Sequence, residues 1–192
     1  TYIESGASSA SELVTEVLQY QNDQPQKMSK VEASIALAGI SVDTKNFSKG
    51  TTTRTFEAAS FLSSQGADNN LIKTLLATEF DKYKKVNEIV LNAEFHDHIA
   101  FGVGLYRKMY DNVTTAKAAD TLLDMVGVDA AFAIVNHEKG YVAVSARSSG
   151  DFNVQRIMEK LGGGGHFNNA AAQVYDKTPN DVKEELLTLI NG

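Results

Sequence analysis

Four consecutive glycines followed by a histidine and two asparagines are the strongest chemical signal in the 192-residue sequence. The stretch reads Gly162-Gly163-Gly164-Gly165-His166-Phe167-Asn168-Asn169. Adjacent glycines cost much backbone entropy, so a folded protein keeps them where it needs positive φ or the close approach of a ligand. Their N–H groups can form a concave anion nest, to which His166, Asn168 and Asn169 would add side-chain donors. We predict a phosphate-binding loop here, built from Gly163, Gly164, Gly165, His166 and Asn168. A flexible linker is the alternative.

An arginine and a serine come shortly before the glycines and are the second candidate. Arg147 and Ser148 end a predicted strand, and a short predicted helix separates them from Gly162. An arginine at a strand end can donate two parallel hydrogen bonds to phosphate oxygens. We therefore predict that Arg147 and Ser148 join the anion site.

Asp43 is the third candidate, because it follows an apolar helical segment. A carboxylate is unfavourable beside the negative end of a helix dipole. From spacing alone, an aspartate that makes an Asx turn toward Lys45 explains the residue. A functional role for the carboxylate is the alternative.

The elements that must position these residues change character halfway along the chain. The first half predicts four helices, which begin near Ser9, Ser29, Phe56 and Asp68. In the first helix we expect a buried apolar face, formed by Leu13, Val14, Val17 and Leu18. The fourth is expected to be long, with Leu71, Ile72, Leu75, Leu76 and Phe80 on its inner face.

The second half predicts strands alternating with helices. Strands are expected at 99–105, 130–136, 141–146 and 170–175, and helices at 114–126, 153–161 and from 178 onward. His137 would lie at the solvated tip of the hairpin formed by the second and third strands. We predict an α/β fold, in which a mostly helical part (1–88) precedes a sheet flanked by helices (89–192).

Composition restricts the possible partners. The net charge of −6 argues against a broad nucleic-acid surface but leaves room for a small anionic ligand. The sequence contains no cysteine, and no apolar run approaches the roughly 18 residues needed to cross a bilayer. We expect this segment to be soluble, without membrane contact. Its start has no Met and no signal peptide, which suggests a fragment.

Three stretches together resemble the DHH/DHHA1 phosphodiesterases. The glycine–histidine motif resembles the DHHA1 signature, and Gly39-Ile40-Ser41-Val42-Asp43-Thr44-Lys45-Asn46-Phe47 resembles the last motif of the DHH domain. The stretch Thr53-Arg54-Thr55-Phe56-Glu57-Ala58-Ala59 extends the match toward the membrane-anchored cyclic-di-AMP phosphodiesterases of Gram-positive bacteria. The resemblance covers essentially the whole chain.

The resemblance implies a function for both parts of the chain. Residues 1–88 would be the C-terminal part of a DHH domain, and 89–192 a DHHA1 domain that binds the substrate. Asp43 would be a ligand of one of two Mn²⁺ ions, and the reaction would convert cyclic-di-AMP to pApA. The family's other metal ligands lie in His-x-Asp-x-Asp, lone Asp and Asp-His-His motifs that this sequence lacks. We therefore expect this chain to be inactive by itself.

Other functions stay open at this point. The same two domains occur in oligoribonucleases and phosphoadenosine-phosphate phosphatases, and a non-catalytic nucleotide-binding module is a third interpretation. The resemblance places the parent protein at the cytoplasmic face of the cell membrane. The base identity of the ligand, the regulation of the parent and the oligomeric state, a homodimer included, are not determined by the sequence.

Overall fold

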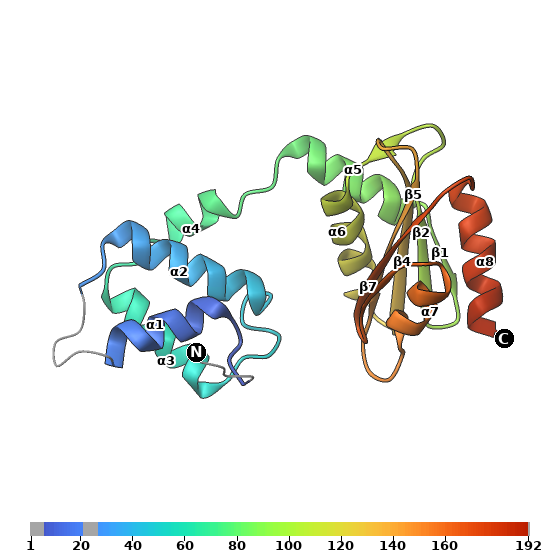
Figure 1. The fold of residues 1–192 in the computed structure, drawn as a ribbon. Coiled ribbons are helices and arrows are strands. Elements are labelled where there is room, and N and C mark those ends of the chain that lie inside the picture. Colours follow the sequence, from blue (N-terminus) through green and yellow to red (C-terminus); the bar gives the residue numbers. More distant parts are fainter. Residues whose placement is uncertain (1–5, 21–26, 192) are drawn as a thin grey trace. The chain divides into compact units, whose positions relative to one another are not determined.

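A computed structural model describes residues 6–20 and 27–191. The chain divides into two compact units, Thr1–Ala77 and Thr78–Gly192 (Figure 1). This division precedes the predicted boundary at 88/89, because helix α5 (Phe80–Leu91) packs on α6 and β2 of the second unit. The identity of the first part as DHH sequence stays a prediction.

The first unit is helical, as predicted. It contains α1 (Ala10–Tyr20), α2 (Lys30–Asp43), α3 (Thr53–Ser64) and α4 (Asn69–Leu75). A capping box begins α2, in which the Ser29 hydroxyl accepts from the Glu32 N–H at 3.2 Å and the Glu32 carboxylate accepts from the Ser29 N–H at 2.8 Å. The core of the unit is formed by Ala33, Leu37, Ile40, Ala58 and Leu62.

The prediction of one long fourth helix is wrong, because a non-helical segment separates α4 from α5. The two helices belong to different units. Helix α4 packs on α2, whereas α5 buries Val86 and Ile89 in the core of the second unit. Residues expected on one inner face are therefore exposed, with Leu75 at 50% and Phe80 at 76%.

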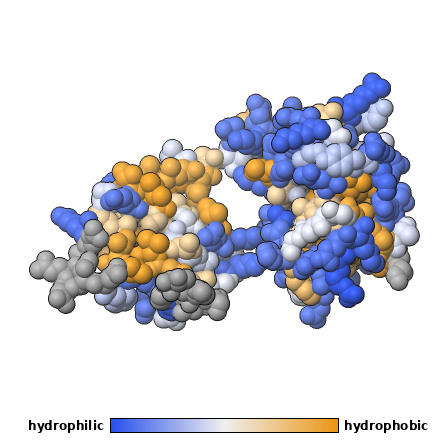
Figure 2. Space-filling model, viewed as in Figure 1, coloured by the Kyte–Doolittle hydropathy of each residue, from blue (hydrophilic) through white to orange (hydrophobic). Residues whose placement is uncertain are grey.

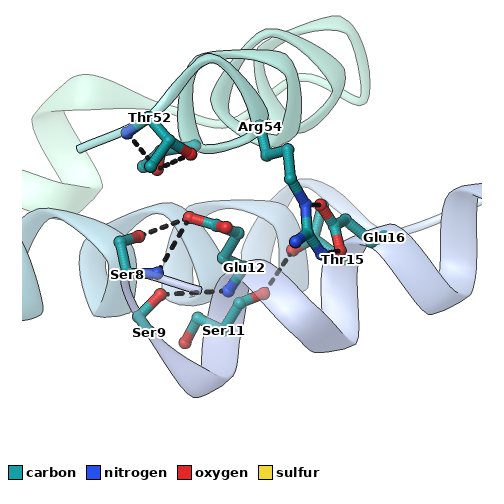
Figure 3. A network of polar contacts seen from close by, with 9 residues as sticks. Ser8, Ser9, Ser11, Glu12, Thr15, Glu16, Thr52 and Arg54 are labelled. Atoms are coloured by element: carbon teal, nitrogen blue, oxygen red, sulfur yellow. Dashed lines mark hydrogen bonds and ion pairs between the residues drawn. The ribbon is translucent and has the colours of Figure 1, made fainter. Parts of the chain in front are cut away.

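The prediction of which side of α1 is buried is also wrong. Val14 is 58% exposed, whereas Glu12 and Thr15 are fully buried. The buried side of α1 is held by one local and one tertiary polar contact (Figure 3). The Glu12 carboxylate accepts from the Ser8 hydroxyl, and the guanidinium of Arg54 on α3 donates to both oxygens of Glu16, at 2.6 and 2.7 Å. Helix α1 thus turns a polar side toward its neighbours.

Apolar side chains consequently lie on the surface of the first unit (Figure 2). The large hydrophobic residues that are more than half exposed in the described part of this unit are Val14, Tyr20, Val31, Ile35, Val42 and Phe56. We expect Ile35→Lys to change the free energy of unfolding by less than about 0.5 kcal/mol, since the site is already hydrated. Urea denaturation checks this, and binding of an apolar fluorescent dye should fall.

Ile40→Ala is the matched control on the same helix. Ile40 is fully buried, so its truncation should cost about 3 kcal/mol. A loss in Ile35→Lys as large as that in Ile40→Ala would show that Ile35 is covered.

The second unit is built on one mixed sheet. Its strands are β1 (Ala93–His96), β2 (Ile99–Val103), β3 (Met109–Tyr110), β4 (Ala130–His137), β5 (Val142–Ser148), β6 (Gly164–His166) and β7 (Asn169–Val174). Their order is β1-β2-β4-β5-β7-β6, and β3 pairs with β4. The β2–β4 and β3–β4 pairs are parallel, and the others are antiparallel.

Helices cover the two faces of this sheet (Figure 1). Helices α5 and α6 (Asn112–Leu123) lie on one face, and α7 (Val154–Lys160) and α8 (Pro179–Asn191) on the other. On the α7–α8 side, Phe101 stacks on Phe132 with ring centroids 5.3 Å apart, and Met158 and Leu186 are fully buried. The predicted α/β class is confirmed. In the described part of the chain, no helix is long and apolar enough to span a membrane.

His137 corrects the expectation of a solvated hairpin tip. It is 7% exposed, and its ring stacks on Tyr141 with centroids 4.4 Å apart and planes 6° apart. Strand β4 extends to His137, whose backbone N–H donates to the carbonyl of Tyr141 at 2.8 Å. The turn is therefore tighter than predicted, and it brings the two rings together.

Candidate functional site

The first two glycines of the run end helix α7. Gly162 has φ +77° and donates to the carbonyl of Glu159 at 3.0 Å, while Gly163 donates to that of Met158 at 2.8 Å. These two hydrogen bonds are the Schellman pattern, in which glycine is favoured at the left-handed position.

Gly163 and Gly165 also let strand β6 lie close to β7. A Cβ atom on Gly163 would lie 2.1 Å from the carbonyl oxygen of Ala171. One on Gly165, whose φ is +148°, would lie 2.5 Å from both the Cα of Ala170 and the carbonyl oxygen of Asn169. Neighbouring backbone leaves no room for a side chain at either position.

Gly164 is different from the other three glycines. A Cβ atom there would meet nothing within 4 Å, and its φ lies outside the left-handed region. The fold therefore explains three of the glycines but gives no reason for the fourth. We infer that the missing side chain at Gly164 leaves space for a ligand.

The glycine run does not form the predicted concave loop. Gly164, Gly165 and His166 form strand β6, because the chain turns at Phe167–Asn168 and pairs antiparallel with β7. The role of these residues in binding stays a prediction. The sequence predicted that a ligand would approach these glycines closely. At Gly163 and Gly165, it is the backbone of strand β7 that lies close.

Strand register brings Arg147, Asn169 and His166 into one row. Arg147 on β5 pairs with Asn169 on β7, which pairs with His166 on β6. Residues directly opposite one another on antiparallel strands project to the same face. The next row on that face holds Ser145, Ala171 and Gly164.

This face is open over β6 and β7. Helix α6 packs on β2, β4 and β5, whereas Asn169, Ala171 and Gln173 alternate as exposed residues along β7. Strand β7 lies between β5 and β6, so its exposure reflects an uncovered face and not an edge. We call this surface the open face; it comprises Arg147, Gly164, His166, Asn169, Ala171 and Gln173.

Arg147 is the most constrained member of the open face. Its Nε donates to the carboxylate of Asp120 on α6 at 3.0 Å, and its Nη1 donates to the carbonyl of Ala146 at 3.1 Å. These contacts occupy two of the five guanidinium N–H groups. The side chain is 14% exposed, so the predicted contact through two hydrogen bonds to a phosphate stays a prediction.

Ser148 and Asn168 do not join this row. Ser148 is adjacent to Arg147 in a strand, so its side chain projects to the opposite face. It is 3% exposed, and its backbone N–H donates to the carbonyl of Asn168 at 3.0 Å. Asn168 lies in the β6–β7 turn. The contact between these two residues stabilises the hairpin end.

One member of the open face, Gln173, was not predicted from the sequence, and Asn169 was predicted only as a donor beside Asn168. A signal was present, since Asn169, Ala171 and Gln173 alternate with apolar residues. That period of two predicts one buried and one exposed face of the strand. It could not show that the exposed face adjoins His166, because the pairing partner was unknown.

Asp43 is the last residue of α2 and is exposed. Lys45, Asn46 and Phe47 follow with φ of 47°, 57° and 63°, a strained left-handed turn in which the Phe47 N–H donates to the Thr44 hydroxyl at 2.9 Å. Over residues 6–20 and 27–191, no group of three or more His, Cys, Asp or Glu side chains could hold a metal ion. A lone carboxylate does not bind a divalent cation firmly, so these residues do not make a complete metal site.

Residues 98–192 match the model of the DHHA1 domain, and this part of the chain belongs to that family. The chain is also 48% identical over 191 residues to the cyclic-di-AMP phosphodiesterase GdpP of Geobacillus thermodenitrificans, covering 99% of this chain and 29% of that protein. It is 44% identical over 192 residues to the cyclic-di-AMP phosphodiesterase PdeA of Listeria monocytogenes, covering 100% of this chain and again 29% of the relative. The predicted family resemblance is confirmed.

The chain thus spans less than a third of the length of these relatives. Among solved structures, an exopolyphosphatase-related protein from Bacteroides fragilis superposes with a TM-score of 0.80 at 21% identity. The match covers 95% of this chain and 57% of the other. At this identity the likeness supports the fold alone.

Proposed function

We propose that this chain is the substrate-binding portion of a phosphodiesterase that hydrolyses cyclic-di-AMP to pApA. The names of the relatives support the reaction, and the open face supports the binding role. The single observation that carries the proposal is Gly164, whose missing side chain has no cause in the fold. It lies beside the row that supplies donors from His166, Asn169 and Arg147.

The open face suits a flat anionic ligand. Gly164 and Ala171 form a floor without long side chains, on which a ribose or base can lie close to the strands. His166 and Asn169 are exposed and can donate hydrogen bonds to a phosphate oxygen at one end of that floor. Such contacts would orient the phosphodiester for attack, which is a positioning contribution to catalysis.

We further propose that Asp43 contributes one ligand to a site for two Mn²⁺ ions in the longer parent protein. Such a pair activates water and stabilises the attacking and leaving oxygens of a phosphodiester. The other ligands would come from outside this chain, because its described residues form no complete site. We therefore expect no hydrolysis by the chain alone, with or without added Mn²⁺.

The resemblance also supports two proposals about the parent. We place it at the cytoplasmic face of the membrane, as in the phosphodiesterases that the sequence resembles. We also propose that the protein forms a homodimer, in which the exposed apolar residues of the first unit would form the interface. Sedimentation of the chain over a range of concentrations tests the dimer.

Calorimetric titration with cyclic-di-AMP and with pApA tests the binding role. We expect micromolar binding, about −8 kcal/mol, and a loss of about tenfold in affinity for His166→Ala. His96→Ala is the matched control, because His96 is exposed on β1 at the opposite edge of the sheet. The absence of binding by the wild-type chain contradicts the proposal. Much tighter binding of linear than of cyclic ligand would favour the oligoribonuclease alternative.

A further inference from the structure

We propose that Tyr175 and Gln173 form a second subsite, which binds the distal adenine of a dinucleotide. This inference rests on the proposed function and adds a residue pair that determines ligand length and base preference. The subsite would lie at the end of the open face away from His166. The phosphate-binding row would then hold one end of the ligand, and Tyr175 the other.

A hollow is present at this end of the face. A depression of about 350 Å³ is lined by Gly162, Gly163, Ala171, Ala172, Gln173 and Tyr175. Along an extended strand, the step from Asn169 to Gln173 covers about 13 Å. The polar row and the hollow are therefore separate places on one continuous surface, which suits a ligand of two nucleotide units.

Tyr175 lies at the end of a row of three aromatic rings, in which His137 and Tyr141 are stacked and Tyr175 is tilted by 55° against Tyr141. The ring of Tyr141 lies 4.4 Å from His137 and 5.7 Å from Tyr175, and both His137 and Tyr141 are 7% exposed. Tyr175 itself is 59% exposed. Its ring thus contacts the buried ring of Tyr141, which His137 supports from behind, and leaves much of its own surface exposed to solvent.

The chemistry of this pair matches a nucleobase. Exposed aromatic rings bind single-stranded bases by stacking, which is insensitive to sequence. Glutamine can make two hydrogen bonds to the N6 and N7 edge of adenine. The side chain of Gln173 is exposed in the same hollow as Tyr175. Tyr175 would therefore supply affinity for any base, and Gln173 the preference for adenine.

Titrations of matched ligands separate the two subsites. We expect Tyr175→Ala to weaken pApA binding about tenfold or more and to leave 5′-AMP binding unchanged, whereas Tyr175→Phe keeps both. Gln173→Ala should reduce the preference for pApA over pUpU. Tyr106→Ala is the control, since Tyr106 is 84% exposed in the β2–β3 connection. In NMR spectra of the wild-type chain, pApA should shift the ring protons of Tyr175 and 5′-AMP should not.

The possible failures are distinguishable. If the wild-type chain binds neither pApA nor cyclic-di-AMP, the proposed function fails. If it binds pApA and Tyr175→Ala binds equally well, only the second subsite fails. Equal weakening of pApA and 5′-AMP by Tyr175→Ala would also overturn the assignment to the distal base, because the residue would then contact the first nucleotide.

Discussion

Gly163→Ala should lower the free energy of unfolding by about 3 kcal/mol, while Gly164→Ala should change it by less than about 0.5 kcal/mol. The two glycines are neighbours in sequence but not in environment. A methyl group on Gly163 would lie 2.1 Å from the carbonyl oxygen of Ala171 and 2.7 Å from the Cα of Ala172. Neither is the end of a flexible side chain, so β6 must move away from β7.

Gly164→Ala is the matched control for this experiment. Its methyl group would meet nothing within 4 Å, and alanine is less flexible than glycine in the unfolded chain. Chemical denaturation followed by circular dichroism measures both variants. Equal losses of stability in the two variants would show that Gly163 is not required for the close contact between β6 and β7. The assignment of separate roles within the glycine run would then fail.

Gly164→Val should weaken nucleotide binding strongly without unfolding the protein. Valine is favoured in strands, and its Cβ at this position lies in open space, so the variant should keep its melting temperature. Its methyl groups would occupy the space above strand β6 in which the ligand would lie, beside His166 and Asn169. We expect the affinity for cyclic-di-AMP to fall about 100-fold, which corresponds to about 2.8 kcal/mol.

Calorimetry on the folded variant measures this loss, and Gly164→Ala again serves as the graded control. The smaller methyl group should weaken binding less than valine does. Unchanged binding by a folded Gly164→Val chain would remove the observation that carries the proposed function. Failure of Gly164→Val to fold would show that the fold does require this glycine.

The sequence by itself determined most local structure in this protein. The Ser29–Glu32 capping box, the glycine after α7 and the alternation in the strands all reflect interactions within a few residues. These local rules gave the α/β class and the region of the candidate site. The motifs also gave the family, which the match over 98–192 confirms.

Tertiary structure decided which side of each element is buried. Helix α1 has an apolar stripe, yet it packs on α2 and α3 with Glu12 and Thr15 fully buried. Next to them, Glu16 accepts hydrogen bonds from Arg54 on α3. The predicted fourth helix is split because its two ends pack in different units. Neither outcome follows from periodicity, which describes one segment without its partners.

Strand pairing likewise decided the composition of the site. Arg147 and Ser148 are adjacent in sequence, but the pleat sends them to opposite faces. Pairing with β7 places Arg147 beside Asn169 and His166, and it turns the expected anion loop into an edge strand. Register depends on contacts between residues about 20 positions apart, so only the folded chain shows that Gly164 faces open space while Gly163 and Gly165 face backbone.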